Sequence, residues 1–256
     1  RSVHGRLTTL KFIIFSYNRG QFLEHCVASI ERYAPDSPIA VYDDASQDPE
    51  TCRVLEGIAT RHTVVSSATI GRHKHGGLYG NMQAAYEDLS DEPLVCFLQD
   101  DMQLVRPLDA DARAAIARYF DVTPNAAFLS VVFAKGPPRD IDPEEFRYAP
   151  DCGAYLPTHD RRSAGTYFAD VCVFRPDRLR AVNWQFAAGE PANDRQARAH
   201  FAVMGLLRDP LAMWLPFGPT YRGRRRTWAI RLAERKHQCG FYPFAPLSDA
   251  QIAGFA

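Results

Sequence analysis

Two aspartates stand side by side after an apolar run, in the stretch VCFLQDDMQLVR at 95–106. If a strand delivers Asp100 and Asp101 together into a cleft, the two carboxylates repel each other unless a cation lies there. Hard divalent ions such as Mg²⁺ and Mn²⁺ take carboxylate oxygens and can bridge to a diphosphate. The pair therefore indicates a metal site, and the alternative is a solvated acidic turn after the strand.

Two further polar clusters also follow apolar runs. The segment SYNR at 16–19 offers a guanidinium, an amide and the aromatic face of Tyr17, which could stack on a base. The segment DDAS at 43–46 offers carboxylates that could accept hydrogen bonds from a base or a ribose. Ordinary turn chemistry is the alternative for both segments, with an Asx turn before the next helix in the case of DDAS.

A glycine-rich and basic stretch, GRHKHGGLYGN, occupies residues 71–81. The GxxxxGK[ST] order of a phosphate-binding P-loop is absent. Its cationic side chains could still contact phosphates, and the alternative is a flexible exposed loop. His73 and His75 are poorer metal candidates, because the hard ions that suit nearby carboxylates do not favour imidazole.

Short apolar runs alternate with helical spacing through the first 100 residues. This alternation predicts a mainly parallel sheet with helices on both faces. In such sheets ligands bind at the carboxyl ends of the strands, so the three polar clusters are expected on one rim. The predicted strands cover 10–15, 39–42, 62–66 and 94–98, and the predicted helices cover 21–33, 48–58 and 81–89.

The second half has a less regular pattern, and its stretch 136–159 is rich in Pro and Asp, which predicts a long loop. The basic segment Arg222–Lys236 predicts a helix that could lie on an anionic membrane surface, close over a diphosphate, or simply face solvent. Strands are predicted over 126–133, 167–174 and 211–215, and helices over 110–119, after Pro176 and over 193–207.

Composition sets wider limits. The chain has 256 residues, of which 46% are hydrophobic, and a formal net charge of zero, so nothing global points to nucleic acid. No apolar run reaches the roughly 18 residues of a membrane span, and the one near the start is too short for a signal peptide. Six scattered cysteines without a CxxC pair indicate reduced thiols in a cytoplasmic protein.

The ordered set FIIFSYNR, VYDDAS, GN…A and CFLQDDMQ resembles the inverting nucleotide-sugar glycosyltransferases of family 2, which have the GT-A fold. The resemblance covers about 10–107, and more weakly 160–215, where YFADVCVFRPDRL looks like the family's second-half strand and helix. It implies a single α/β domain over 1–256 with a Rossmann-like, mainly parallel central sheet. The expected parts are a nucleotide-sugar-binding half at about 8–107, an acceptor half at about 108–220 and a basic tail at 221–256.

The resemblance also implies an activity. The chain would transfer a sugar from a UDP-, GDP- or dTDP-sugar to a hydroxyl of a glycan or a lipid-linked acceptor, in the cytoplasm or at the inner face of the membrane. The donor's diphosphate would bring Mn²⁺ or Mg²⁺ with it. Gln99 stands where many members have an acid, and Met102 and Gln103 follow the pair, which implies weak metal affinity.

Residue roles carry over by position. Tyr17 would lie near the base, Asp44 would read the base with Asp43 beside it, and Arg72 would contact the base and phosphates. Asp101 would bind the metal, with Asp100 near the ribose or also on the metal. The implied nucleotide-binding set is Ser16, Tyr17, Asn18, Arg19, Asp43, Asp44, Arg72 and Asp100.

Inverting transfer needs a carboxylate that takes a proton from the acceptor hydroxyl. A metal and basic groups stabilise the leaving diphosphate. In the family this base lies at the start of a late helix, which matches GEPANDRQARAH at 189–200. Asp194 is the first candidate and Glu190 the second, and the alternative is that Asn193 and Asp194 cap the helix.

Two rival functions remain open from the sequence. A nucleotidyltransferase would carry a glycine-rich loop with Arg and Lys directly after the first strand, and SYNRGQF fits that poorly. A degenerate relative would bind a nucleotide without turnover, and the missing acids around 99–103 favour it.

Overall fold

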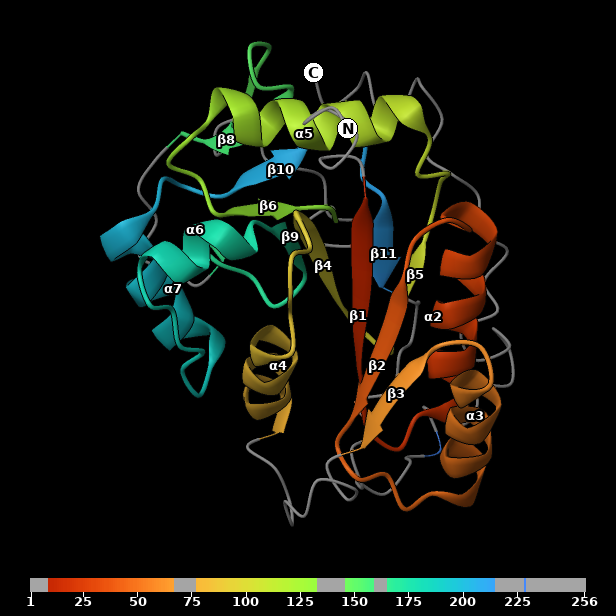
Figure 1. Ribbon diagram of the computed structural model, residues 1–256. Helices are drawn as coiled ribbons and strands as arrows, with labels where there is room; N and C mark the ends of the chain where they lie inside the picture. Colours follow the sequence, from red (N-terminus) through yellow and green to blue (C-terminus); the bar gives the residue numbers. More distant parts are fainter. Residues whose placement is uncertain (1–8, 67–76, 133–145, 159–164, 215–227, 229–256) are drawn as a thin grey trace.

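The structure is a computed structural model that describes residues 9–66, 77–132, 146–158, 165–214 and 228. Figure 1 shows a central sheet with helices on both sides. The nine described strands of this sheet follow the order β3-β2-β1-β4-β9-β6-β10-β8-β7. Its first four strands are β1 (Leu10–Ser16), β2 (Ile39–Asp43), β3 (Thr63–Ser66) and β4 (Leu94–Gln99).

The four leading strands run parallel, as the alternating pattern predicts. β1 pairs with β2 and β4, and β2 pairs with β3. The connecting helices are α2 (Gly20–Tyr33), α3 (Pro49–Ala59) and α4 (Gly77–Glu87). Asp48 caps α3, because its carboxylate accepts a hydrogen bond from the backbone N–H of Thr51 at 2.9 Å.

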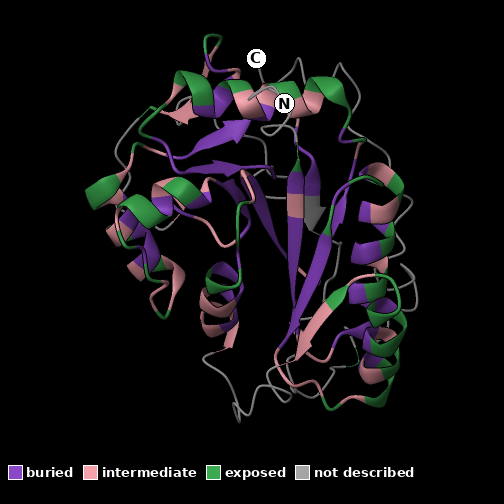
Figure 2. Ribbon diagram, viewed as in Figure 1, coloured by how far each residue is buried: buried purple, intermediate pink, exposed green. Residues whose placement is uncertain are grey.

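Alternation along the strands divides the core into two layers. Phe12 and Ile14 of β1 pack with α2, α3 and α5 (Ala110–Val122), whereas Ile13 and Phe15 pack with α4, α6 (Pro176–Ala181) and α7 (Glu190–His200). Successive strand residues point to opposite faces of the sheet. Because helices cover both faces, the strand residues on both faces are apolar. Figure 2 shows β1, β2 and β4 as largely buried, the edge strand β3 as intermediate to exposed, and exposed residues on the outward sides of the helices.

The second half completes the sheet with mixed strand directions. β9 (Cys172–Phe174) lies antiparallel between β4 and β6 (Phe128–Ser130), and β10 (Gly205–Leu207) is parallel to β6. A hairpin of β7 (Phe146–Ala149) and β8 (Ala154–Pro157) adds to β10. β5 (Met102–Leu104) and β11 (Ala212–Trp214) form a separate antiparallel pair.

Two helix predictions need correction. The helix predicted over 193–207 begins at Glu190 and ends at His200, and residues 205–207 belong to β10. Gly189, with φ 129°, precedes it, so neither Asn193 nor Asp194 is its cap. The helix predicted from residue 81 begins at Gly77, because its apolar positions continue backwards through glycines that look like a turn in sequence.

Three further strands were not predicted, and the long loop needs correction. β5 follows the aspartate pair directly, so this pair forms a two-residue turn between two strands. The hairpin of β7 and β8 lies inside the predicted long loop at 136–159. Each strand has only four residues, and the Pro and Asp residues around them predict a loop.

Three predicted features fall wholly or largely outside the described residues. They are the basic stretch at 71–76, which contains Arg72, the part of the predicted loop at 136–145, and Arg222–Lys236 apart from Trp228, whose side chain is exposed. Within the described ranges, no helix has both the length and the apolar character that crossing a bilayer requires.

Candidate functional site

Parallel pairing brings the polar strand ends to one edge of the sheet. Ser16 at the end of β1 is paired with Asp43 of β2, and Phe15 is paired with Gln99 of β4. The predicted convergence of SYNR, DDAS and QDD on one rim is therefore confirmed.

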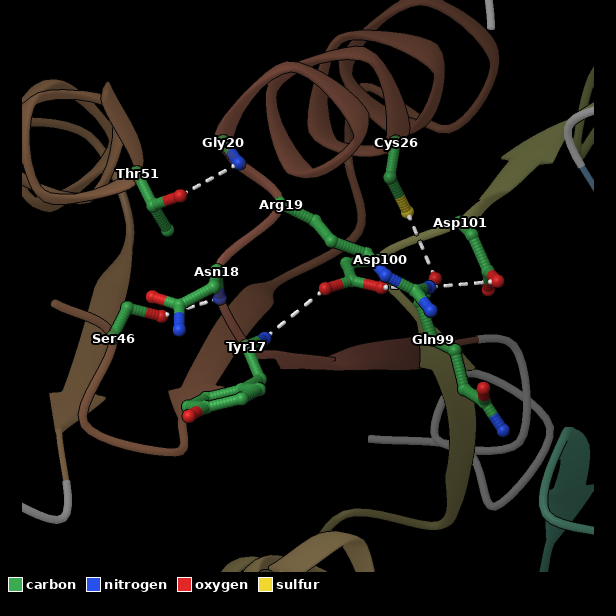
Figure 3. A network of polar contacts seen from close by, with 10 residues as sticks. All are labelled: Tyr17, Asn18, Arg19, Gly20, Cys26, Ser46, Thr51, Gln99, Asp100 and Asp101. Atoms are coloured by element: carbon green, nitrogen blue, oxygen red, sulfur yellow. Dashed lines mark hydrogen bonds and ion pairs between the residues drawn. The ribbon is translucent and has the colours of Figure 1, made fainter. Parts of the chain in front are cut away.

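Arg19 lies between the two aspartates (Figure 3). Its Nη1 is 3.0 Å from Asp100 Oδ1 and 2.8 Å from Asp101 Oδ2. The backbone N–H of Tyr17 donates to the other oxygen of Asp100 at 3.1 Å. The side chains of Arg19, Asp100 and Asp101 are only 5%, 6% and 16% exposed. The sequence predicts a divalent metal beside these carboxylates, and in this structure a guanidinium of the same chain lies between them.

Burial dominates the electrostatics of this ion pair. Desolvation raises the pKa of Asp100 to about 7, the Arg19 guanidinium lowers it, and the neighbouring Asp101 raises it again. One guanidinium offsets two carboxylates only in part, so the pair keeps an excess of negative charge when both acids are ionised.

Three buried polar atoms around this pair have no hydrogen-bond partner among the described residues: Asp101 Oδ1, Arg19 Nε and Ser16 Oγ. An unpaired carboxylate oxygen is a suitable ligand for a hard divalent ion. No group of three His, Cys, Asp or Glu side chains in the described ranges could hold such an ion. The residues thus fit a metal through Asp101 only if a bound molecule supplies further ligands.

Asn18 and Asp43 hold the two turns together. Asn18 has φ 50°, its backbone N–H donates to Ser46 Oγ at 2.8 Å, and its Oδ1 accepts from the backbone N–H groups of Gln47 and Asp48. Asp43 is buried and accepts from the backbone N–H and the hydroxyl of Ser46. These contacts agree with the turn interpretation of both residues.

Asp44 and Tyr17 border a pocket of about 210 Å³ at the strand ends. Asn81 Nδ2 donates to Asp44 Oδ1 at 3.1 Å and ties the pocket to α4. In Figure 3 the Tyr17 ring points away from the ion pair. The pocket is lined by Phe15, Ser16, Tyr17, Arg19, Asp44, Gly77, Leu78, Asn81, Gln99 and Asp100.

Asn81 and Leu78 are pocket residues that were not among the candidates from sequence. The GN…A element at the start of the predicted helix contains Asn81, so the sequence did offer a signal for this pocket residue. Its amide donates to Asp44, and Leu78 belongs to the first turn of α4, which begins at Gly77, one turn earlier than predicted.

Asp194 is buried away from solvent and anchors the backbone. Its Oδ1 accepts hydrogen bonds from the backbone N–H groups of Thr166, Tyr167 and Phe168 at 2.9, 2.7 and 3.1 Å. A carboxylate oxygen with three donors is poorly placed to take a proton from an acceptor. The geometry suits a residue that holds the segment before β9.

Glu190 begins α7 in a half-buried cluster of acids. Asp170 belongs to this cluster and accepts a hydrogen bond from the Tyr79 hydroxyl at 2.8 Å. Tyr79 is the residue after Leu78, which lines the pocket. Burial and then the charge of Asp170 raise the pKa of Glu190 to about 7, against a backbone hydrogen bond from Asp170 that lowers it. A carboxylate with a pKa near neutrality can exchange a proton at physiological pH.

Comparison with known proteins gives a fold. No family model matches the sequence, and no curated protein matches it. A mannosyltransferase from Pyrobaculum calidifontis, solved with GDP-Man and Mn²⁺, has a TM-score of 0.51 and 14% identity over 90% of this chain, which spans 62% of that chain. Glucosyl-3-phosphoglycerate synthase from Mycobacterium tuberculosis, solved with Mn²⁺, UDP and phosphoglyceric acid, has a TM-score of 0.50 and 15% identity over 96% of this chain and 81% of that one. The chain therefore has the Rossmann-like GT-A fold that its sequence predicts.

Proposed function

We propose that the chain is an inverting glycosyltransferase that moves a sugar from a nucleoside-diphosphate sugar to a hydroxyl of a glycan or a lipid-linked acceptor. The pocket at the joined ends of β1, β2 and β4 carries this proposal. Tyr17 offers a face for a base, Asp44 an acceptor for base or ribose, and Arg19 a cation for a diphosphate. Structures of the same fold hold GDP-Man or UDP, which supports a UDP- or GDP-sugar over a dTDP-sugar.

A divalent ion belongs to this proposal as a partner of the donor. Asp101 would hold Mn²⁺ or Mg²⁺ through Oδ1, its buried oxygen without a partner in the described residues. When bound, such an ion supplies positive charge for the leaving diphosphate. Both neighbouring structures are complexes with Mn²⁺, which supports manganese.

Glu190 replaces Asp194 as the proposed catalytic base. Its carboxylate would take the proton of the acceptor hydroxyl while that oxygen attacks the anomeric carbon of the donor sugar. Asp194 has its Oδ1 committed to three backbone donors, whereas Glu190 stands at the start of α7 with its pKa raised toward neutrality.

A second function has one observation in its favour. Arg19 already neutralises part of the charge of Asp100 and Asp101, which suits a relative that binds a nucleotide without turnover. No contact in the described residues favours a nucleotidyltransferase. Membership of family 2, a cytoplasmic location and a membrane contact through Arg222–Lys236 remain proposals from the sequence.

Turnover separates these functions. The chain would be incubated with UDP-, GDP- and dTDP-sugars, with Mn²⁺ or chelator, and with glycan and lipid-linked acceptors, and the released nucleoside diphosphate would be measured. We expect release that depends on one donor and one acceptor class, and its loss in an Asp44→Asn variant. Donor binding without release under any condition would favour the binding function.

A further inference from the structure

Arg19 occupies the position for which the sequence predicts a metal. We propose that Arg19 is an internal counter-ion that competes with divalent metal for Asp100 and Asp101, so that the chain takes a metal only when the guanidinium leaves the pair. The inference deepens the proposed function, because a donor diphosphate would be the anion that draws Arg19 away.

Charge and burial explain why a cation stabilises this pair. The two carboxylates are adjacent in sequence and nearly buried, and one guanidinium nitrogen contacts both. A buried charge pair that loses one partner is strongly destabilised, because the remaining charge is left without compensation. Exchanging one cation for another therefore keeps the charge compensated, whereas leaving the site without any cation costs stability.

Geometry makes the two cations exclusive. Arg19 Nη1 engages one oxygen of each aspartate, and Asp100 Oδ2 accepts from the backbone of Tyr17. In the described residues, only Asp101 Oδ1 is left over on the pair. A divalent ion that bound to Asp101 Oδ1 alone would be held weakly. An ion that bound to Asp100 Oδ1 or Asp101 Oδ2 would have to displace Arg19 Nη1, because both cations are positively charged and repel each other.

The resident arrangement is also incomplete, which lowers the free-energy cost of replacing it. Arginine usually binds carboxylates with two parallel hydrogen bonds, but here a single nitrogen serves both acids. Arg19 Nε and Asp101 Oδ1 are both buried without partners in the described part of the chain. A half-satisfied buried network is electrostatically costly. Arg19 also lines the pocket, so an anion there offers its guanidinium a second place to bind.

Metal affinity without nucleotide tests the competition directly. Mn²⁺ binding would be measured by isothermal titration calorimetry for the wild type, Arg19→Met, Arg19→Lys and the double variant Arg19→Met with Asp101→Asn. We expect Arg19→Met to bind Mn²⁺ at least tenfold more tightly than the wild type. Arg19→Lys keeps the charge and should stay near the wild type, and the double variant should lose the gain. An Arg19→Met affinity no higher than that of the wild type would overturn the proposal.

Thermal unfolding covers the case in which Arg19→Met folds poorly. In chelator, this variant should melt about 10 °C below the wild type, since it leaves two buried acids unpaired. Millimolar Mn²⁺ should restore most of that difference while shifting the wild type little. A variant that stays unfolded in Mn²⁺ would show that Arg19 is irreplaceable and would overturn the competition.

A nucleotide arm separates this inference from the proposed function. UDP or GDP should raise the Mn²⁺ affinity of the wild type, and Mn²⁺ should raise the nucleotide affinity by the same factor. If Arg19→Met gains Mn²⁺ affinity but no nucleoside diphosphate binds, the competition stands and the glycosyltransferase proposal fails.

Discussion

Replacing Asp194 distinguishes an anchor from a catalytic base. Three backbone N–H groups, from Thr166, Tyr167 and Phe168, share its Oδ1, and the side chain is buried. Hydrogen bonds to a charged group contribute about 1.5–3 kcal/mol each, and bonds that share one acceptor do not add fully. Asp194→Ala should therefore lower the free energy of unfolding by about 3–5 kcal/mol.

Asp194→Asn is the matched variant. Its amide oxygen can still accept from the same donors but carries no charge, so the expected loss is about 1–2 kcal/mol. Urea unfolding followed by circular dichroism measures both losses, and an unchanged m-value shows that both variants unfold from the same native state.

Activity completes the test. If Asp194 is an anchor, Asp194→Asn should bind donor normally and keep its transfer rate within several-fold of the wild type. An Asp194→Asn variant as stable as the wild type, with transfer reduced by on the order of a hundredfold, would refute the anchoring role and return the base to Asp194.

Three other perturbations follow from the structure. Glu190→Gln should keep donor binding and lose transfer by on the order of a hundredfold, and wild-type kcat should fall as pH drops below about 7, because the base must be deprotonated; a flat pH profile between 5 and 9 would contradict this role. Tyr17→Ala should weaken nucleotide binding by about 1–3 kcal/mol in calorimetry through lost stacking, with Tyr17→Phe as the control that keeps the ring; equal affinity in Tyr17→Ala would place the base elsewhere. Gly20→Ala should destabilise the fold by about 1–3 kcal/mol in urea unfolding, because its Cβ would lie 2.9 Å from the backbone N and Cα of Thr51, whereas Gly57→Ala has open space and should not; equal stability of the two variants would contradict that contact.

Local pattern was sufficient for the first half of the fold. Apolar runs of four to six residues, separated by helical spacing, identify β1 to β4, and parallel pairing then places their polar ends on one rim. The edge of the sheet on which the pocket lies was predictable too, because it follows from strand direction, whereas the part of its lining that comes from α4 was not.

Tertiary contacts explain what the sequence could not show. Arg19 and Asp100 are 81 residues apart in sequence. Whether a guanidinium lies beside the aspartates therefore depends on how the turn after β1 packs against the end of β4. The anchoring contacts of Asp194 likewise come from a segment more than 25 residues earlier. One local signal for α7 was available and missed: Pro191 in the first turn is typical of a helix start.

In the proposed function, the rim of β1, β2 and β4 binds a nucleoside diphosphate. The first measurement is the thermal shift of the purified chain with UDP, GDP, dTDP and CDP, each with Mn²⁺ and with chelator. We expect one diphosphate to raise the melting temperature, more strongly with Mn²⁺, and Asp44→Asn to lose the shift. If no diphosphate stabilises the chain in either condition, the pocket is not a donor site and the proposed function fails.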